Sequence, residues 1–114
     1  MEIEILSRGI SLTESQLEFI ERRIRFAMDR FSEQTGTVRI TLSDINGPKG
    51  GNDVLVRMQM RLHRSGDVVV GDTGDSVEAI VSGIADRAAR SVARLLERQR
   101  DHQGMSMSGQ TNPR

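Results

Sequence analysis

The segment from Val54 to His63 restricts the fold most, because its side chains alternate between two chemical classes. One set is entirely apolar and consists of Val54, Val56, Met58, Met60 and Leu62. The other set is mainly polar and consists of Leu55, Arg57, Gln59, Arg61 and His63. Successive side chains of a strand point to opposite sides of a sheet, so this pattern predicts a strand with one buried face. A sheet built from such strands needs a second layer to cover its apolar face.

Three further segments are predicted to be strands. Residues 2–7 place Ile3 and Ile5 on one side and Glu2 and Glu4 on the other. A second strand alternates in the same way, with Val38, Ile40 and Leu42 opposite Arg39, Thr41 and Ser43. Residues 68–70 form a short strand that follows a tight turn at 64–67, which predicts a hairpin with the strand at 54–63. Residues 46–52, rich in glycine and asparagine, are predicted to be a loop.

Two amphipathic helices complete the pattern. Thr13 and Gln16 stand at the positions of a capping box, which predicts a helix from about 14 to about 31. Its apolar stripe consists of Leu17, Ile20, Ile24, Ala27, Met28 and Phe31. Asp75 is a suitable N-cap for a second helix from about 76 to about 100. That helix has a stripe of Val77, Ile80, Val81, Ile84, Ala88, Val92 and Leu95.

The expected architecture is therefore an α+β domain of order β-α-β-β-β-α, a four-stranded mixed sheet with two helices packed on one face. The strand–helix–strand crossover makes the first two strands parallel, and the remaining strands form an antiparallel meander. Residues 1–100 are expected to be this domain, and residues 101–114 a disordered polar tail.

Composition excludes several classes of function. The 114 residues carry no net charge and contain no cysteine, which excludes disulfide scaffolds, cysteine zinc sites and thiol catalysis. No apolar run approaches the roughly 20 residues of a membrane helix. The acidic, alternating N-terminus is unlike a signal peptide, so a cytoplasmic protein is expected. Arginine accounts for all basic residues except Lys49, and its planar guanidinium suits phosphate and nucleobases.

The arginines on the two helices are the candidate RNA-binding residues. On the second helix, Arg87, Arg94 and Arg98 lie within about 40° of one another, and Arg90 lies about 60° from Arg87. If the helices pack side by side, the first-helix arginines join them across the intervening groove. The full candidate set is Arg22, Arg23, Arg25, Arg30, Arg87, Arg90, Arg94 and Arg98. Such a ridge can follow RNA phosphates, although the alternative is a solvated face with Asp86 and Glu97 as partners.

Other sites are weaker. The sheet's outer face carries Arg39, Arg57 and Arg61 without aromatic residues, so cross-strand pairing with Glu2 and Glu4 is favoured there over base stacking. His63 and His102 are far apart in sequence, and no catalytic set or metal cluster accompanies them. We expect neither enzymatic activity nor a cofactor. A small hydrolase would need a pocket around His63.

The chain resembles the short ribosome hibernation promoting factors and ribosome-associated inhibitors, a sigma-54 modulation protein-like family. The N-terminal pattern Met-x-Ile-x-Ile, the segment Ile10–Glu14 and a helix ending at Phe31 match without gaps. The segment Asp75–Ile80 is similar to the family's Asp-Met-Tyr-x-Ala-Ile, and the turn at Ser65–Gly66 also fits. The resemblance covers about residues 1–100.

This resemblance implies a fold related to double-stranded RNA-binding domains. It also implies a protein that binds small-subunit ribosomal RNA in the decoding channel, where it sterically blocks tRNA and mRNA during stress or stationary phase. We expect the chain to be a monomer. No catalysis, cofactor, membrane or small-molecule substrate is implied. Arg23 matches a basic position of the family, and Arg87, Arg90 and Arg94 match basic positions after a shift of one residue.

The chain also departs from the family pattern. Val77 replaces the family's tyrosine, and a sparser arginine run interrupted by Glu97 replaces its lysine-rich helix end. Without the additional C-terminal domain of the long forms, the chain is not expected to pair ribosomes by itself. The alternative hypothesis is a protein-interaction or regulatory module that reuses this fold with weak or no RNA binding.

Overall fold

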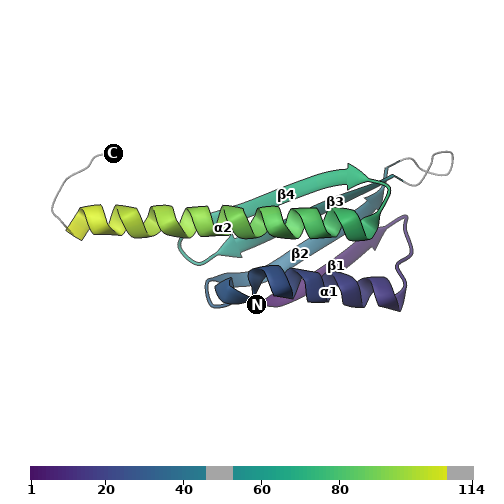
Figure 1. Cartoon of the computed structure of the whole chain (residues 1–114), viewed down its shortest axis with the longest axis horizontal. Helices are drawn as coiled ribbons and strands as arrows, with labels where there is room; N and C mark the ends of the chain where they lie inside the picture. Colours follow the sequence, from purple (N-terminus) through teal and green to yellow (C-terminus); the bar gives the residue numbers. More distant parts are fainter. Residues whose placement is uncertain (46–52, 108–114) are drawn as a thin grey trace.

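The computed structural model describes residues 1–45 and 53–107, with side chains described up to residue 100. The elements in chain order are β1 (Glu2–Arg8), α1 (Glu14–Met28), a 3-10 turn η1 (Asp29–Phe31), β2 (Thr35–Asp44), β3 (Val54–Leu62), β4 (Gly66–Gly74) and α2 (Val77–Met107). Figure 1 shows α1 and α2 side by side against the sheet, with the C-terminal part of α2 running beyond it.

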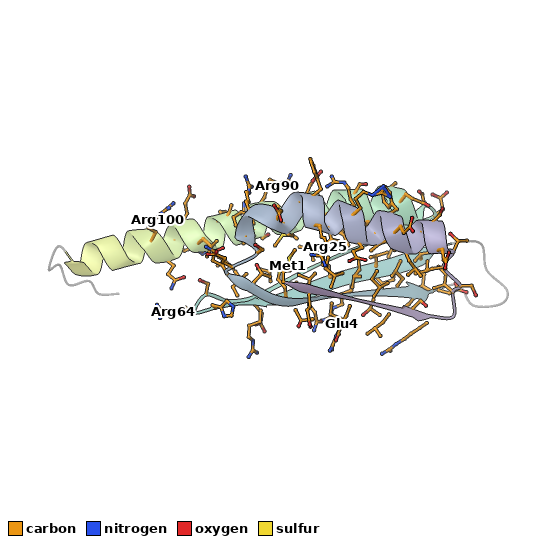
Figure 2. The ribbon with its side chains drawn as sticks, turned by 90° about the horizontal axis from the view of Figure 1, so that it is seen from below. Met1, Glu4, Arg25, Arg64, Arg90 and Arg100 are labelled. Carbon is orange, nitrogen blue, oxygen red and sulfur yellow. The ribbon has the colours of Figure 1, made fainter. Side chains whose placement is uncertain are left out.

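The four strands form one sheet in the order β1-β2-β3-β4. β1 is parallel to β2, whereas β2–β3 and β3–β4 are antiparallel. Figure 2 shows both helices on the same side of the sheet, with Glu4 on the opposite side. The predicted α+β class, element order and mixed sheet are confirmed.

The alternating strand residues supply the floor of the core. All five apolar residues of the β3 pattern are at most 5% exposed, and Ile20, Ile24 and Met28 of α1 are fully buried above the sheet. The α2 stripe is also buried, except that Leu95 is half-buried. Leu17, predicted to belong to the α1 stripe, is instead 37% exposed. It lies within about 20° of Ile24 around the helix but seven residues earlier, in the first turn of α1, so its position along the helix, and not its angle, accounts for its exposure.

Both helices begin at side-chain caps. The amide of Gln16 donates to the Thr13 hydroxyl at 3.1 Å, and the Thr13 amide donates to the Gln16 side chain at 3.0 Å, which confirms the capping box. At the start of α2 the cap is one residue later than predicted. The hydroxyl of Ser76, and not the carboxylate of Asp75, accepts the amide of Ala79 at 3.2 Å.

Two elements are longer than the sequence predicts. β4 extends to Gly74 because its backbone continues to pair with β3, and pairing needs no particular side chains. α2 continues past residue 100 to Met107, into the segment predicted to be a disordered tail, because a polar composition predicts exposure but does not prevent helix propagation. The predicted loop at 46–52 and residues 108–114 lie outside the described residues.

The sheet face opposite the helices carries cross-strand ion pairs. Arg39 donates to Glu4 at 3.0 Å from the directly paired position, as the alternation predicts. Arg61 donates to Asp67 of β4 at 3.1 Å. This face also leaves Leu6, Leu55 and Val69 between 37% and 51% exposed.

Candidate functional site

The largest concentration of candidate arginines lies in a groove between α1 and α2, here named the interhelical groove. It has a volume of about 830 Å³ and is open to solvent. Its lining residues are Arg22, Arg25, Phe26, Ala27, Asp29, Arg30, Asp86, Ala89 and Arg90. Four of the eight arginines predicted from the sequence therefore share one surface.

The first wall of the groove is the outer side of α1. Arg22 and Arg25 lie three residues apart, so the helix places them on neighbouring positions of one face. Arg25 donates to Glu21, one turn earlier, at 3.2 Å; both side chains are about half exposed, so this pair is weak. Arg30 follows in η1, with its guanidinium 4.6 Å from the centre of the Phe31 ring.

The second wall belongs to α2, and one ion pair fixes its distance from α1. Arg23 donates to Asp86 at 2.8 Å and to the Ser82 carbonyl at 3.5 Å. Ala89, three residues after Asp86, is small and buried, which allows the helices to lie close together. Arg90 follows on the same side of α2 and is exposed at the rim. Figure 2 shows it on the helical side of the molecule.

The remaining second-helix arginines are not in the groove. Arg87 donates to the Gly71 carbonyl at 2.8 Å and has a nitrogen 4.0 Å from the Asp72 carboxylate, so it faces β4. Arg94 and Arg98 are exposed on the same side of the helix as Arg87. The structure thus brings together Arg22, Arg25, Arg30 and Arg90, holds Arg23 between the helices, and leaves the other three apart.

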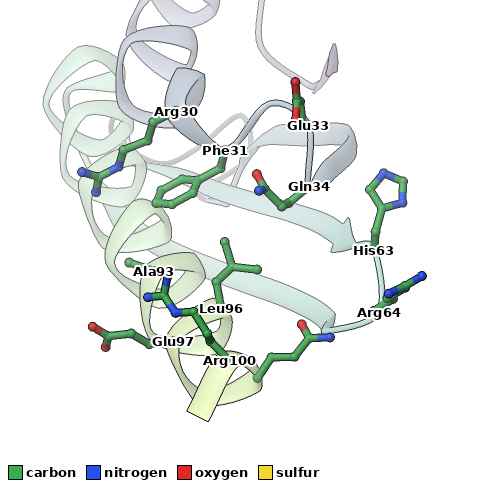
Figure 3. A pocket seen from close by; sticks show the side chains of 11 residues that line it. Arg30, Phe31, Glu33, Gln34, His63, Arg64, Ala93, Leu96, Glu97 and Arg100 are labelled. Carbon is green, nitrogen blue, oxygen red and sulfur yellow. The ribbon is translucent and has the colours of Figure 1, made fainter. Parts of the chain in front are cut away.

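A second hollow continues the groove toward the C-terminal half of α2. This hollow, the terminal pocket, has a volume of about 760 Å³ and shares Arg30 with the groove. Arg64 and Arg100 also line it, together with Glu33 and Glu97. In Figure 3 the Phe31 ring lies inside the pocket, with Leu96 beside it. Through Arg30, the two hollows give one basic track along the helices.

The electrostatics of the track favour an anionic ligand. The groove itself contains four arginines and two aspartates, and Asp86 is already bound to Arg23. Among the described residues, Arg22, Arg30 and Arg90 have no ion-pair partner. Free guanidinium groups on a concave surface can bind successive phosphates, and a chain with no net charge can still present such a local patch.

Comparison with known proteins identifies the family. A family model described as "Sigma 54 modulation protein / S30EA ribosomal protein" matches residues 3–100. The chain belongs to this family. The resemblance seen in the sequence is therefore confirmed, and the protein is a ribosome-associated protein of the hibernation and modulation type. No curated protein sequence is significantly similar to the chain.

Two solved structures support the same fold. The N-terminal domain of Protein Y from Thermus thermophilus is 21% identical, with a TM-score of 0.68; the alignment covers 82% of this chain and 98% of that one. A ribosomal subunit interface protein from Coxiella burnetii is 12% identical, with a TM-score of 0.61; the alignment covers 89% of this chain and 99% of that one. At these identities the likeness concerns the fold alone.

The terminal pocket contains His63, the residue on which a hydrolase would depend. The structure pairs its backbone amide with the Gln34 carbonyl at 2.9 Å, and its imidazole makes no hydrogen bond to another described residue. Among the described residues, no serine, threonine or cysteine lines the pocket to act as a nucleophile. Within residues 1–45 and 53–100, no group of three or more metal-ligating side chains comes together.

Membrane insertion through a helix finds no support either. In the part of the chain that the structure describes, none of the helices combines the length and the apolar character that crossing a bilayer requires.

The lining residues outside the predicted set include Phe26, Arg64 and Arg100. Helical geometry gave a signal for Phe26, because it lies about 160° from Ile24 and therefore opposite the apolar stripe. Arg64 reaches the pocket from the β3–β4 turn, and Arg100 from the end of the predicted helix. Their proximity to Arg30 depends on how the sheet and helices pack, which periodicity does not specify.

Proposed function

We propose that the interhelical groove binds small-subunit ribosomal RNA and that the bound protein occupies the decoding channel. One observation carries the proposal: Arg22, Arg30 and Arg90, from two helices and the 3-10 turn, line a single groove without ion-pair partners among the described residues. A protein in that channel blocks tRNA and mRNA by occupying their space. This mechanism needs only binding, and it agrees with the family's ribosome-associated role.

Under this proposal the arginines have different roles. Arg22, Arg30 and Arg90 bind phosphates directly, and Arg25 contributes after releasing its weak contact with Glu21. Arg23 supports the groove by holding α1 against α2. Arg87, Arg94 and Arg98 lie on the β4 side of α2, where they can contact RNA only if it also passes over that side. The protein acts as a monomer in the cytoplasm.

Co-sedimentation with purified small ribosomal subunits tests the proposal. A variant with Arg22, Arg30 and Arg90 changed to Glu should lose binding, whereas the parent chain should bind at low salt and dissociate at high salt. The matched control changes Arg87, Arg94 and Arg98 to Glu, with the same change in charge on the other side of α2. Binding that survives the groove variant but not the control would place the RNA contacts over β4 and contradict the proposal.

A second measurement addresses the position on the ribosome. Chemical footprinting of small subunits should show protection of decoding-channel nucleotides, and saturating tRNA with mRNA should displace the protein. Protection confined to another part of the subunit would refute steric occlusion while leaving ribosome binding intact.

The alternative function, a protein-interaction module, is supported by the sheet face that the helices leave uncovered. Leu6, Leu55 and Val69 are exposed there beside Arg57, a combination that suits a protein surface as well as solvent. A variant with Leu55 and Val69 changed to Ser should leave ribosome co-sedimentation unchanged if the groove is the binding surface. Loss of binding in that variant would favour the sheet face.

A further inference from the structure

Phe26 stands out among the hydrophobic residues of the described chain. It is 80% exposed, more than any other large hydrophobic residue among those described, and it lines the interhelical groove among the arginines. The remaining apolar side chains of α1 are directed into the core or half-covered at its margin. Phe26 therefore contributes little to packing, and its ring is free to contact a ligand in the groove.

The ring is backed by a fixed cation. The guanidinium of Arg23 lies over it, 5.5 Å from the ring centre, a distance typical of cation–π contact. Arg23 is itself only 20% exposed, and it is fixed by its bonds to Asp86 and the Ser82 carbonyl. Contact with this fixed guanidinium gives the Phe26 ring a defined position before any ligand arrives, which lowers the entropy lost on binding.

The surroundings of the ring select the ligand. Arg22, Arg25 and Arg90 line the same groove, so a group lying on the ring has guanidinium groups around it. A nucleotide offers both complementary parts, a planar base for the aromatic ring and a phosphate for the arginines. An aliphatic protein side chain could cover the ring but would leave Arg22 and Arg90 without counter-charges.

We propose that Phe26 is a stacking platform for one unpaired nucleobase of the bound RNA, with the groove arginines holding the adjacent phosphates. This inference rests on the proposed function, because it specifies how the same groove recognises RNA. A base within a duplex is stacked between its neighbours and cannot lie on the ring, so the platform selects single-stranded or unpaired positions.

Two substitutions separate stacking from simple hydrophobic contact. Phe26→Leu retains an apolar side chain without a π-face, and Phe26→Trp retains and enlarges the π-face. Aromatic stacking on a base is worth a roughly 5- to 150-fold change in affinity. Phe26→Leu should therefore weaken binding to small ribosomal subunits within that range, while Phe26→Trp binds at least as tightly as the parent. Because the ring is not a phosphate contact, the slope of affinity against salt should stay unchanged in Phe26→Leu.

The Trp variant also provides a direct reporter, since the parent chain contains no tryptophan. Its fluorescence should be quenched by a short single-stranded RNA and far less by the blunt duplex of the same sequence. Val69→Trp, on the opposite face at a residue that is 51% exposed, is the matched control and should report neither RNA.

The outcomes distinguish this inference from the proposed function. If the parent binds subunits and Phe26→Leu binds equally well, the stacking platform is refuted while the groove proposal stands. Equal quenching by single-stranded and duplex RNA also refutes it. If the parent binds neither subunits nor RNA, the proposed function and this inference fail together. Weakened binding in Phe26→Leu with selective quenching in Phe26→Trp supports both.

Discussion

Arg23 of α1 and Asp86 of α2, which are 63 residues apart in the chain, are joined by an ion pair of 2.8 Å between Nη2 and Oδ1. This contact does more than link two helices. It sets the spacing between Arg22 and Arg25 on one wall of the interhelical groove and Arg90 on the other. It also holds the guanidinium that lies over Phe26. The geometry of the candidate site thus depends on one charged pair that joins its two walls.

Replacing Asp86 by Ala should lower the free energy of unfolding by about 1 kcal/mol, since the carboxylate is half exposed and water partly replaces it. This loss of stability is larger than for a fully exposed ion pair, because Arg23 is mostly buried and its Nη1 already has no hydrogen-bond partner. Urea denaturation measures the effect. Glu21→Ala, which removes the exposed partner of Arg25, is the control and should cost at most about 0.5 kcal/mol. Equal losses in the two variants would show that the interhelical pair contributes no more to the free energy of unfolding than the exposed Arg25–Glu21 pair does.

Arg90 and Arg87 lie three residues apart but should differ in their effect on RNA binding. Arg87 donates a hydrogen bond to the Gly71 carbonyl and lies near Asp72, whereas Arg90 has no ion pair in the described part of the chain. Arg90→Gln should reduce the slope of log affinity against log salt by about 0.7–0.9, the contribution of one phosphate contact. Arg87→Gln should leave the slope unchanged. Affinities for small subunits over a range of salt concentrations provide the measurement, and an equal reduction by both substitutions would contradict the groove assignment.

Most of the fold could be predicted from local patterns. Alternation in β3 and the capping box at Thr13 each report a physical requirement that acts within a few residues. The errors arose where neighbouring residues compete for one role. Asp75 and Ser76 can both cap a helix, and only the path of the backbone decides that Ser76 accepts the Ala79 amide. α2 continues to Met107, beyond the end that the sequence predicts, because polar residues can propagate a helix that is already formed.

The candidate site was less predictable for a different reason. Helical periodicity gives the angle between Arg87 and Arg90, but it does not say which neighbouring element lies on each side. That depends on the small residue Ala89 and on the Arg23–Asp86 pair, which bring α1 against one flank of α2. Arg90 consequently lines the groove and Arg87 faces β4. A spacing rule within one helix cannot specify a contact between elements.

Gly83 and Gly66 should respond in opposite directions to the same substitution. Gly83 lies exposed within α2, and a Cβ added there would meet no atom within 4 Å. Gly83→Ala should raise the free energy of unfolding by about 0.5–1 kcal/mol, because alanine loses less backbone entropy than glycine on entering a helix. Gly66, the first residue of β4 directly after the β3–β4 turn, also has space around it, but its φ of 95° is one that L-residues rarely adopt. Gly66→Ala should therefore lower the free energy of unfolding by about 1–2 kcal/mol.

Chemical denaturation of both alanine variants checks this pair of predictions, and neither residue lines the groove or the terminal pocket. Binding to small subunits should thus remain at the parent level in each variant under conditions where both are folded. If Gly66→Ala proved as stable as the parent, the turn would have to adopt another backbone conformation without cost. In that case the left-handed φ of 71° at Arg64, in the turn that precedes Gly66, would also not be required by the hairpin. Opposite signs for the two variants would show that backbone conformation, rather than available space, decides where this chain needs glycine.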